Sequence, residues 1–393
     1  MNVIYLDNNA TTKVAPEVVD AMLPYLSEYY GNPSSMHSFG GDVAEKIKEA
    51  RENVANLIGA TADEIVFTSC GTESDSTAIR AAVESNPDRK HIVTSRVEHP
   101  AVKNLYETLS KKGYRVTFVP VDGQGNLDLD YLYSNLSNDT AVVSLMWANN
   151  ETGVIFPIEE ISQKIKDRGI VFHTDAVQAV GKLPIDINET GVDLLSLSGH
   201  KLHAPKGIGV LYIRKGTKFS PFMIGGHQER GRRGGTENVA SIVALGKAAE
   251  LAQKHLDEDG YAHIGQLRDK LEAALLTRIS HSMVNGDREH RLLNTTSIAY
   301  EYVVGEAVLL MMNEHGICAS SGSACTSGSL EPSHVLRAMG VPFTAAHGSI
   351  RYSLSRYTTA EEIDVVIEKT PPIIERLRSM SPFWKEAVKL AAV

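Results

Sequence analysis

Two polar residues that could do acid–base and covalent chemistry follow apolar, strand-like runs. Lys201 comes after Leu194–Ser198, and Asp175 comes directly after Ile170–Thr174. A lysine whose pKa is lowered by burial can form a Schiff base with an aldehyde. An acid at a strand end can hold a ring nitrogen protonated, although a lone Asp is more often a helix cap. The pair therefore indicates a site for an aldehyde that carries a basic ring.

Other strand-like runs end in polar residues that could complete such a site. The small polar turn at Gly71 and Thr72 opens a helix, and free backbone N–H groups there suit a phosphate. His99 and Asn150 follow two further runs, and each of them alone would more often be structural than catalytic. Ligands of open α/β sheets bind beyond the carboxyl ends of the strands. The coincidence of these residues at neighbouring strand ends therefore favours a functional reading.

Together these residues meet the requirements of pyridoxal 5′-phosphate. That cofactor needs a lysine, an acid for its pyridine nitrogen, a phosphate cup and a group that stacks on its ring. Lys201, Asp175 and His99 can supply the first, the second and the last. The phosphate cup can be built from Gly71, Thr72, Ser198 and His200. A surface lysine that merely follows a strand would leave the other three groups unexplained.

The elements that must position these residues alternate along the chain. Strand-like runs and amphipathic helical stretches, such as Asp42–Leu57 and Ile158–Arg168, alternate through the first two-thirds. This pattern predicts an α/β fold with a mostly parallel sheet between helices. The expected strands are Glu64–Thr68, His91–Ser95, Val116–Pro120, Ala141–Ala148, Ile170–Thr174, Leu194–Ser198 and Gly209–Ile213.

The pattern changes in the last third of the chain. A long helical stretch that includes His263–Leu276 precedes the strand-like run Asn294–Tyr300 and the helical run Glu306–Met312. A chain of 393 residues also exceeds one compact domain. We therefore expect an N-terminal segment at 1–14 that packs with a smaller α/β domain at 259–393, and a large cofactor-binding domain at 15–258.

Composition excludes several classes of protein. With 42% hydrophobic and 22% charged residues the chain is an ordinary globular one, and a net charge of −9 argues against binding nucleic acid or anionic membranes. No run approaches the roughly 20 apolar residues that span a bilayer. The first residues show no basic, apolar secretory pattern, so we expect a cytoplasmic protein.

Three cysteines, Cys70, Cys318 and Cys325, do not form close-spaced pairs. An odd, dispersed set predicts neither a disulfide framework nor an intrinsic metal site. Cys70 and Cys318 lie beside apolar runs and are expected to be buried packing residues. Cys325 differs because it lies in the Ser/Gly-rich segment Ser320–Ser329, which predicts a loop. One reactive thiol is the simplest reading.

Motifs spread over nearly the whole chain resemble the cysteine desulfurases, particularly their nitrogen-fixation (NifS-like) branch. The branch resemblance is carried by Met146-Trp147-Ala148-Asn149-Asn150 and by Ser323-Ala324-Cys325-Thr326-Ser327-Gly328-Ser329. The family resemblance is carried by Asp7-Asn8-Asn9-Ala10-Thr11-Thr12, Gly31-Asn32-Pro33-Ser34-Ser35, Gly71-Thr72-Glu73-Ser74, Glu98-His99-Pro100-Ala101-Val102, Asn149-Asn150-Glu151-Thr152-Gly153, His173-Thr174-Asp175-Ala176-Val177-Gln178, Ser198-Gly199-His200-Lys201 and Ser321-Gly322-Ser323-Ala324-Cys325.

The resemblance implies a fold-type I pyridoxal-phosphate transferase and a role for each matching residue. Lys201 would bind the cofactor covalently, Asp175 would contact its pyridine nitrogen and Gln178 its phenolic oxygen, while His99 would stack on the ring. Asn150 would face both cofactor and substrate, and Thr236 would reach the phosphate of a partner subunit in a homodimer. The phosphate-holding residues would be Gly71, Thr72, Ser198, Gly199 and His200.

Cys325 is what distinguishes this reaction from transamination, because aminotransferases share the lysine and the acid. Its thiolate would take the sulfur of L-cysteine as a persulfide and leave L-alanine, with His99 placed to shuttle protons. Arg351 is the best candidate for binding the substrate carboxylate, and Arg356 is its rival.

The resemblance also implies the destination of the sulfur. A NifU-like iron–sulfur scaffold would accept it, so that the Cys325 persulfide would transiently contact a nascent 2Fe–2S cluster as part of nitrogenase maturation. Other possible readings are a housekeeping desulfurase, a selenocysteine lyase, an aminotransferase and a non-catalytic sulfur carrier. A carrier or scaffold would need clustered thiols and no cofactor lysine.

Overall fold

A seven-stranded sheet forms the centre of the larger lobe of this computed structural model, which describes residues 3–321 and 332–384. Its strand order is β2-β8-β7-β6-β5-β3-β4, and only β8 runs against the others. The predicted α/β fold with a mostly parallel sheet is therefore confirmed. The strands are β2 (Ile65–Thr68), β3 (His91–Ser95), β4 (Arg115–Val119), β5 (Thr140–Ser144), β6 (Val171–Asp175), β7 (Leu194–Ser198) and β8 (Gly209–Ile213).

Helices cover both faces of this sheet, so its strands are buried on both sides. The residues Val66, Ile92 and Val142 pack with α4 and α5 in one cluster, while their neighbours Phe67 and Val143 face the other cluster with α3, α7 and α8. Alternation of this kind follows from the two-residue period of a strand. These helices are α3 (Ser38–Leu57), α4 (Gly71–Glu84), α5 (Pro100–Lys111), α7 (Ile158–Lys166) and α8 (Val239–Asp257), with the short α6 (Leu129–Ser134) between β4 and β5.

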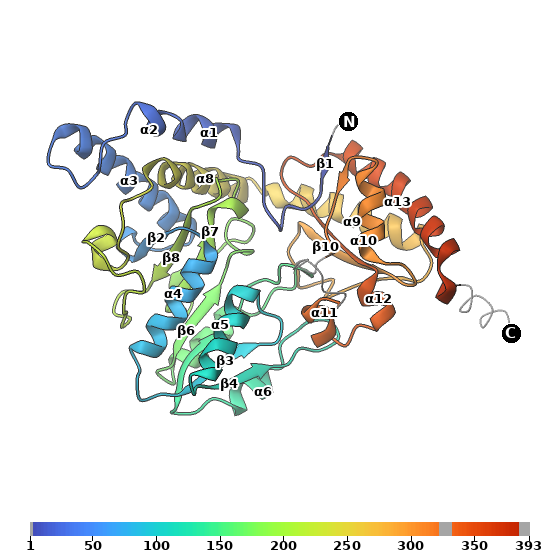
Figure 1. Cartoon of the computed structure of the whole chain (residues 1–393), viewed down its shortest axis with the longest axis horizontal. Coiled ribbons are helices and arrows are strands. Elements are labelled where there is room, and N and C mark those ends of the chain that lie inside the picture. The colour runs from blue at the N-terminus through green and yellow to red at the C-terminus, as the bar shows by residue number, and fades with distance from the viewer. Residues whose placement is uncertain (1–2, 322–331, 385–393) are drawn as a thin grey trace.

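A second sheet lies in the C-terminal lobe, on the right of Figure 1. Its antiparallel order is β12-β10-β9, and a separate apolar cluster joins it to its helices. The elements are β9 (Ser282–Val284), β10 (Thr295–Tyr300), β12 (Ser349–Ser353), α9 (Gly260–Arg278), α10 (Gly305–Asn313) and α13 (Ala360–Met380).

The N-terminal strand belongs with this second lobe. Strand β1 (Ile4–Tyr5) pairs in parallel with β11 (Ile317–Cys318), and Ile4 and Leu6 join the C-terminal apolar cluster. In contrast, α11 (His334–Ala338) and α12 (Phe343–His347) supply Val335 and Ala346 to the cluster of the large sheet. The boundaries of the predicted domains stay a prediction.

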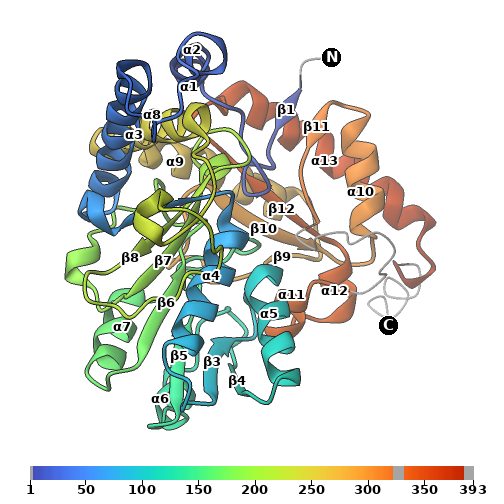
Figure 2. The same ribbon diagram turned by 60° about the vertical axis from the view of Figure 1, so that its left-hand side comes forward.

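The remaining helices are short or lie at the edge of the large lobe (Figure 2). They are α1 (Pro16–Met22), α2 (Pro24–Ser27) and the four 3₁₀ turns Ala62–Glu64, Ile187–Glu189, Gly199–Lys201 and Gln228–Gly231. Across residues 3–321 and 332–384, no helix combines the length and the apolar character that crossing a bilayer requires.

Close packing between α3 and α8 predicts opposite effects of the same substitution at two helical glycines. A Cβ at Gly246 would lie 2.5 Å from both Cα and Cβ of Ala50, whereas a Cβ at Gly41 would meet nothing within 4 Å. Gly246→Ala should destabilise the protein by about 1–3 kcal/mol through overpacking. Gly41→Ala should be neutral or stabilising by up to about 1 kcal/mol. Thermal unfolding midpoints measure both, and equal midpoints would contradict the packing.

Candidate active site

Most of the predicted site residues surround one cavity at the carboxyl ends of the parallel strands. The cavity has a volume of about 620 Å³. Its walls include Gly71, Thr72, His99, Asn150, Asp175, Gln178, Ser198, His200, Lys201 and Arg351. Residues from both lobes thus line a single cavity, at the place expected for ligand sites of open α/β sheets.

Two predicted residues in the described part of the chain, Gly199 and Thr236, do not line this cavity. Gly199 lies in the turn after β7, where an added Cβ would come within 2.7 Å of the Ile208 side chain, so its small size serves packing. Thr236 is exposed and lies away from the cavity. Cys325 and most of the predicted Ser320–Ser329 loop lie outside the described residues.

Lys201 follows β7 in a 3₁₀ turn and extends its amine to the N-terminal segment. Its Nζ donates to the backbone oxygen of Ala10 at 2.7 Å and also to that of Asn9. Burial, with a further contribution from the Arg351 cation, lowers the pKa of Lys201 to about 8. A substantial fraction of the amine is therefore neutral near pH 8, as covalent chemistry with an aldehyde requires.

Asp175 ends β6 as a buried carboxyl group. One of its oxygens accepts a hydrogen bond from the backbone N–H of Val177 at 3.0 Å. Burial raises the pKa of Asp175, while His99 and Lys201 oppose that rise. A cationic ring nitrogen next to this carboxyl group would favour its ionised form.

His99 presents a neutral imidazole to the same cavity. The residue caps α5, where its Nδ1 accepts from the backbone N–H of Ala101 at 3.2 Å. Burial lowers the pKa of His99. Because Nδ1 is an acceptor, the neutral ring carries its proton on Nε2.

The N-terminus of α4 supplies a cradle for an anion. Among the described residues no side chain caps this helix, so the backbone N–H groups of its first turn are not taken up by a cap. A Cβ at Gly71 would lie 2.9 Å from Val177 Cγ2 and 3.4 Å from Ser198 Cβ, so only glycine allows this approach. The donors of this cradle fit a phosphate, and the acid and lysine fit a pyridine aldehyde. The residues present therefore fit pyridoxal phosphate.

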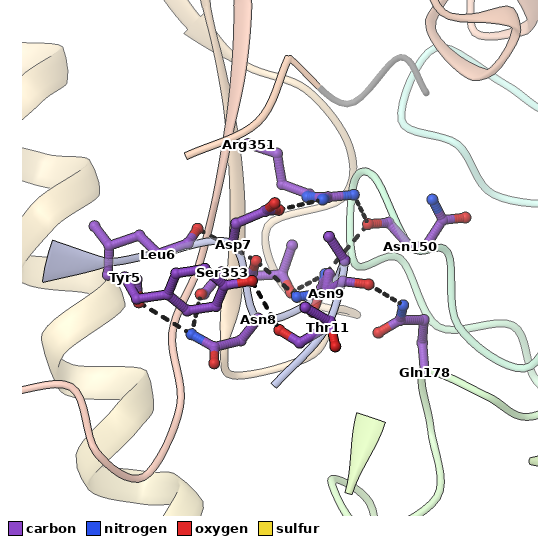
Figure 3. Close-up of polar contacts among 12 residues, drawn as sticks. Tyr5, Leu6, Asp7, Asn8, Asn9, Thr11, Asn150, Gln178, Arg351 and Ser353 are labelled. Carbon is purple, nitrogen blue, oxygen red and sulfur yellow. Dashed lines mark hydrogen bonds and ion pairs between the residues drawn. The ribbon is translucent and has the colours of Figure 1, made fainter. Parts of the chain in front are cut away.

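Arg351 reaches the cavity from β12 of the second sheet (Figure 3). Its Nη1 donates to the backbone oxygen of Asn150 at 2.8 Å, and its Nη2 pairs with Asp7 Oδ1 at 2.7 Å. The side chain is only 5% exposed, and its buried Nε finds no hydrogen-bond partner in the described residues. Arg356, the rival predicted for carboxylate binding, lies outside the cavity wall, 5.4 Å over the Tyr357 ring.

Sequence reasoning missed several residues that support the site. Asn9 lies at its centre: its backbone oxygen accepts from Gln178 Nε2 at 2.9 Å, and its Nδ2 donates to Asn150 (Figure 3). Lys182 is buried and donates to Gln178 Oε1. In the sequence, Asn9 stood out only as a member of a motif. Lys182 follows a turn and not the end of a strand-like run, so its position gave no sign of a functional role.

Two buried acids behind Asp175 were also missed. Glu98 accepts from Ser95 Oγ at 2.6 Å, and burial raises the pKa of Glu98 to about 8. Asp75 is buried with its Oδ1 3.6 Å from His173 Nε2, and burial and the Asp175 charge raise its pKa. The prediction that Cys70 and Cys318 are buried packing residues is also corrected, because both are half-buried and Cys70 lines the cavity.

Comparisons with known proteins agree with this geometry. A family model described as aminotransferase class-V matches residues 4–366. A cysteine desulfurase of Trichormus azollae is 61% identical over 383 residues, covering 98% of this chain and 96% of that protein. The cysteine desulfurase NifS of Azotobacter vinelandii is 60% identical over 382 residues, covering 97% and 95%. A solved NifS-like protein has a TM-score of 0.89 at 38% identity, covering 96% of this chain and 100% of that one.

The fold and the site define a pyridoxal-phosphate-dependent enzyme of the class-V aminotransferase type. Within that class, the chain belongs to the cysteine desulfurase family. The resemblance, the fold class and the cofactor inferred from the sequence are thereby confirmed.

The lowered pKa of Lys201 predicts when its amine becomes reactive. In protein freed of cofactor, reductive methylation of the Lys201 peptide should rise with pH around a midpoint near 8, instead of near 10.5. Arg351→Met should raise that midpoint because it removes a cation, and Asp7→Asn should lower it because it removes an anion. Mass spectrometry of the labelled peptides measures the midpoints, with surface lysines as internal references. Shifts of the same sign in both variants would contradict this account.

Proposed function

We propose that this enzyme removes sulfur from L-cysteine, releases L-alanine and keeps the sulfur as a persulfide on Cys325. One observation carries the proposal. Lys201 and Arg351 line the same cavity as Ser320 and Pro332, which flank the segment that contains Cys325. The amine and the group proposed to bind the carboxylate thus share a cavity with two described residues that flank the segment containing Cys325.

The chain's residues would divide the work as follows. Bound pyridoxal phosphate supplies an electron sink for the pair that remains when an amino acid loses its α-proton. Lys201 would hold the cofactor and exchange that proton, and Asp175 would keep the ring nitrogen protonated. His99 would stack on the ring and relay protons, and Gln178 would donate to the phenolic oxygen.

The sulfur transfer balances without an added oxidant or reductant. The thiolate of Cys325 attacks the substrate sulfur, so that an S–S bond forms and the C–S bond of the substrate breaks. The bonding pair stays with the amino acid carbon, which is protonated to give L-alanine. Cys325 is left as a persulfide that can be passed to an acceptor.

Arg351 would bind the substrate carboxylate, and Asn150 would lie beside both cofactor and substrate. The guanidinium is buried and is held by Asp7 and by the backbone oxygen of Asn150, so its orientation is fixed before the substrate arrives. Its Nε, which lacks a partner within the described residues, adds a donor. A planar guanidinium binds a carboxylate bidentately.

We also propose the location of the enzyme, its oligomeric state and the acceptor of its sulfur. It would act as a cytoplasmic homodimer in which Thr236, exposed and outside its own chain's cavity, reaches the phosphate of the second subunit. A NifU-like iron–sulfur scaffold would take the sulfur, in support of nitrogenase maturation. The 60% identity to the NifS of Azotobacter vinelandii supports that assignment. Sedimentation equilibrium tests the dimer, and a fully active monomer would contradict it.

Replacing Cys325 with Ala separates sulfur transfer from other amino acid chemistry. Cys325→Ala removes the nucleophile and none of the groups assigned to the cofactor. Binding of pyridoxal phosphate and exchange of the α-proton of L-cysteine should therefore persist. Formation of alanine should fall by about 100-fold or more, since the step needs the thiolate.

The measurements are the visible spectrum, hydrogen exchange by mass spectrometry and an alanine assay. Cys70→Ala and Cys318→Ala are the matched controls and should keep alanine formation. In the unaltered enzyme, the added sulfur should be found on the Cys325 peptide. Sulfur on Cys70 or Cys318, or full alanine formation by Cys325→Ala, would refute the assigned nucleophile.

A further inference from the structure

Lys182 is a buried lysine next to the cofactor cavity that the reaction above does not use. It follows the turn after β6, and only 7% of its surface is exposed. Its Nζ donates to Gln178 Oε1 at 2.7 Å and to Asn9 Oδ1 at 3.2 Å. Both acceptors are neutral amides, and within the described chain Lys182 forms no ion pair with a carboxylate.

Burial of this amine without a paired carboxylate disfavours its charged form. Burial, with contributions from the nearby cations Lys201 and Arg351, lowers the pKa of Lys182 well below its usual range. In both of its hydrogen bonds the amine is the donor, and each acceptor is an amide oxygen. Lys182 therefore acts on its surroundings through the direction of these bonds more than through charge.

The hydrogen bond from Lys182 determines the orientation of the Gln178 amide. Lys182 needs an acceptor, so Gln178 must turn Oε1 toward it. Nε2 then points the other way and donates to the backbone oxygen of Asn9 at 2.9 Å (Figure 3). This is its only hydrogen bond among the described residues, and Gln178 lines the cavity. A second N–H of the amide is thus left for a ligand in the cavity.

We infer that Lys182 is a positioning residue: it fixes the Gln178 amide so that an N–H, and not a carbonyl oxygen, faces the phenolic oxygen of the bound cofactor. This inference rests on the proposed function, which assigns Gln178 to that oxygen. A donor there draws negative charge from the phenolic oxygen. The conjugated nitrogen that links Lys201 to the cofactor consequently becomes less basic, and the visible spectrum reports its pKa.

The test is a spectroscopic pH titration of the protein loaded with pyridoxal phosphate. Lys182→Met keeps the length of the side chain but cannot donate. It should raise the pKa of the visible transition by about one pH unit, the size expected for one lost hydrogen bond. Lys182→Leu, which also removes the donor, gives a second reading with the same expected direction if the Met variant does not fold.

A double variant separates positioning from a direct effect of charge. If Lys182 acts through Gln178, Gln178→Leu raises the pKa alone, and adding Lys182→Met produces no further shift. The charged and titratable groups around this wall are unchanged throughout, so their contributions cancel. They include Asp7, Asp75, His99, Glu151, Asp175, His200, Lys201 and Arg351.

Asn294→Ala is the matched control. Asn294 Nδ2 is the other donor to Asn9 Oδ1, at 3.2 Å, but Asn294 has no contact with Gln178. This variant should lower thermal stability without moving the spectroscopic pKa. A purely structural role for Lys182 would lower stability in Lys182→Met and likewise leave the pKa unchanged.

The outcomes distinguish this inference from the proposed function. Absence of a pH-dependent visible band in the unaltered protein would refute the proposed function. A normal band whose pKa is the same in Lys182→Met, or a shift that persists in the Gln178→Leu background, would overturn only the role of Lys182. The role of Lys182 is supported if Lys182→Met raises the pKa of the visible transition in the otherwise unaltered protein but leaves it unchanged in the Gln178→Leu background.

Discussion

The hydrogen bonds of a single buried residue, Asn9, are the constraint on which the site depends. Its backbone oxygen accepts from Lys201 and Gln178, and its side chain accepts from Lys182 and donates to Thr295 Oγ1 at 2.9 Å. Any of these groups left unpaired in the protein interior would cost free energy. The N-terminal segment, the strand ends of the large sheet and β10 of the second sheet must therefore meet in one arrangement, which is the arrangement that forms the cavity.

Burial of three acids at or near the cavity wall influences which of them carries negative charge. Desolvation raises the pKa of Asp75, Glu98 and Asp175, and adjacent carboxylates in a low dielectric oppose one another's ionisation. Of these three acids, only Asp175 has its charged form stabilised by His99 and Lys201. The arrangement favours ionisation of Asp175 over that of Asp75 and Glu98, which is what a protonated ring nitrogen needs.

The clustering of Asp175, Lys201 and His99 could be predicted from the sequence because each follows an apolar run, and the carboxyl ends of parallel strands share an edge. The antiparallel direction of β8 could not, since an apolar run carries no sign of its direction. Strand β5 ends at Ser144 and not at the predicted Ala148, because pairing beyond Ser144 is irregular: Leu145 and Trp147 still donate to β6, whereas Ala148 forms an isolated bridge with Ile155. Asn9 and Lys182 escaped prediction because long-range partners determine their roles.

Arg351, which lines the cavity, also pairs through its backbone with Ser320, close to the start of the segment that contains Cys325. Its backbone N–H donates to the Ser320 oxygen at 2.6 Å, and its backbone oxygen accepts from Ser320 N at 3.2 Å. The guanidinium of the same residue contacts Asn150 and Asp7. A strand is a stiffer support than a loop. Ser320, one of the last described residues before the segment that contains Cys325, is therefore held by the backbone of the residue proposed to bind the substrate carboxylate.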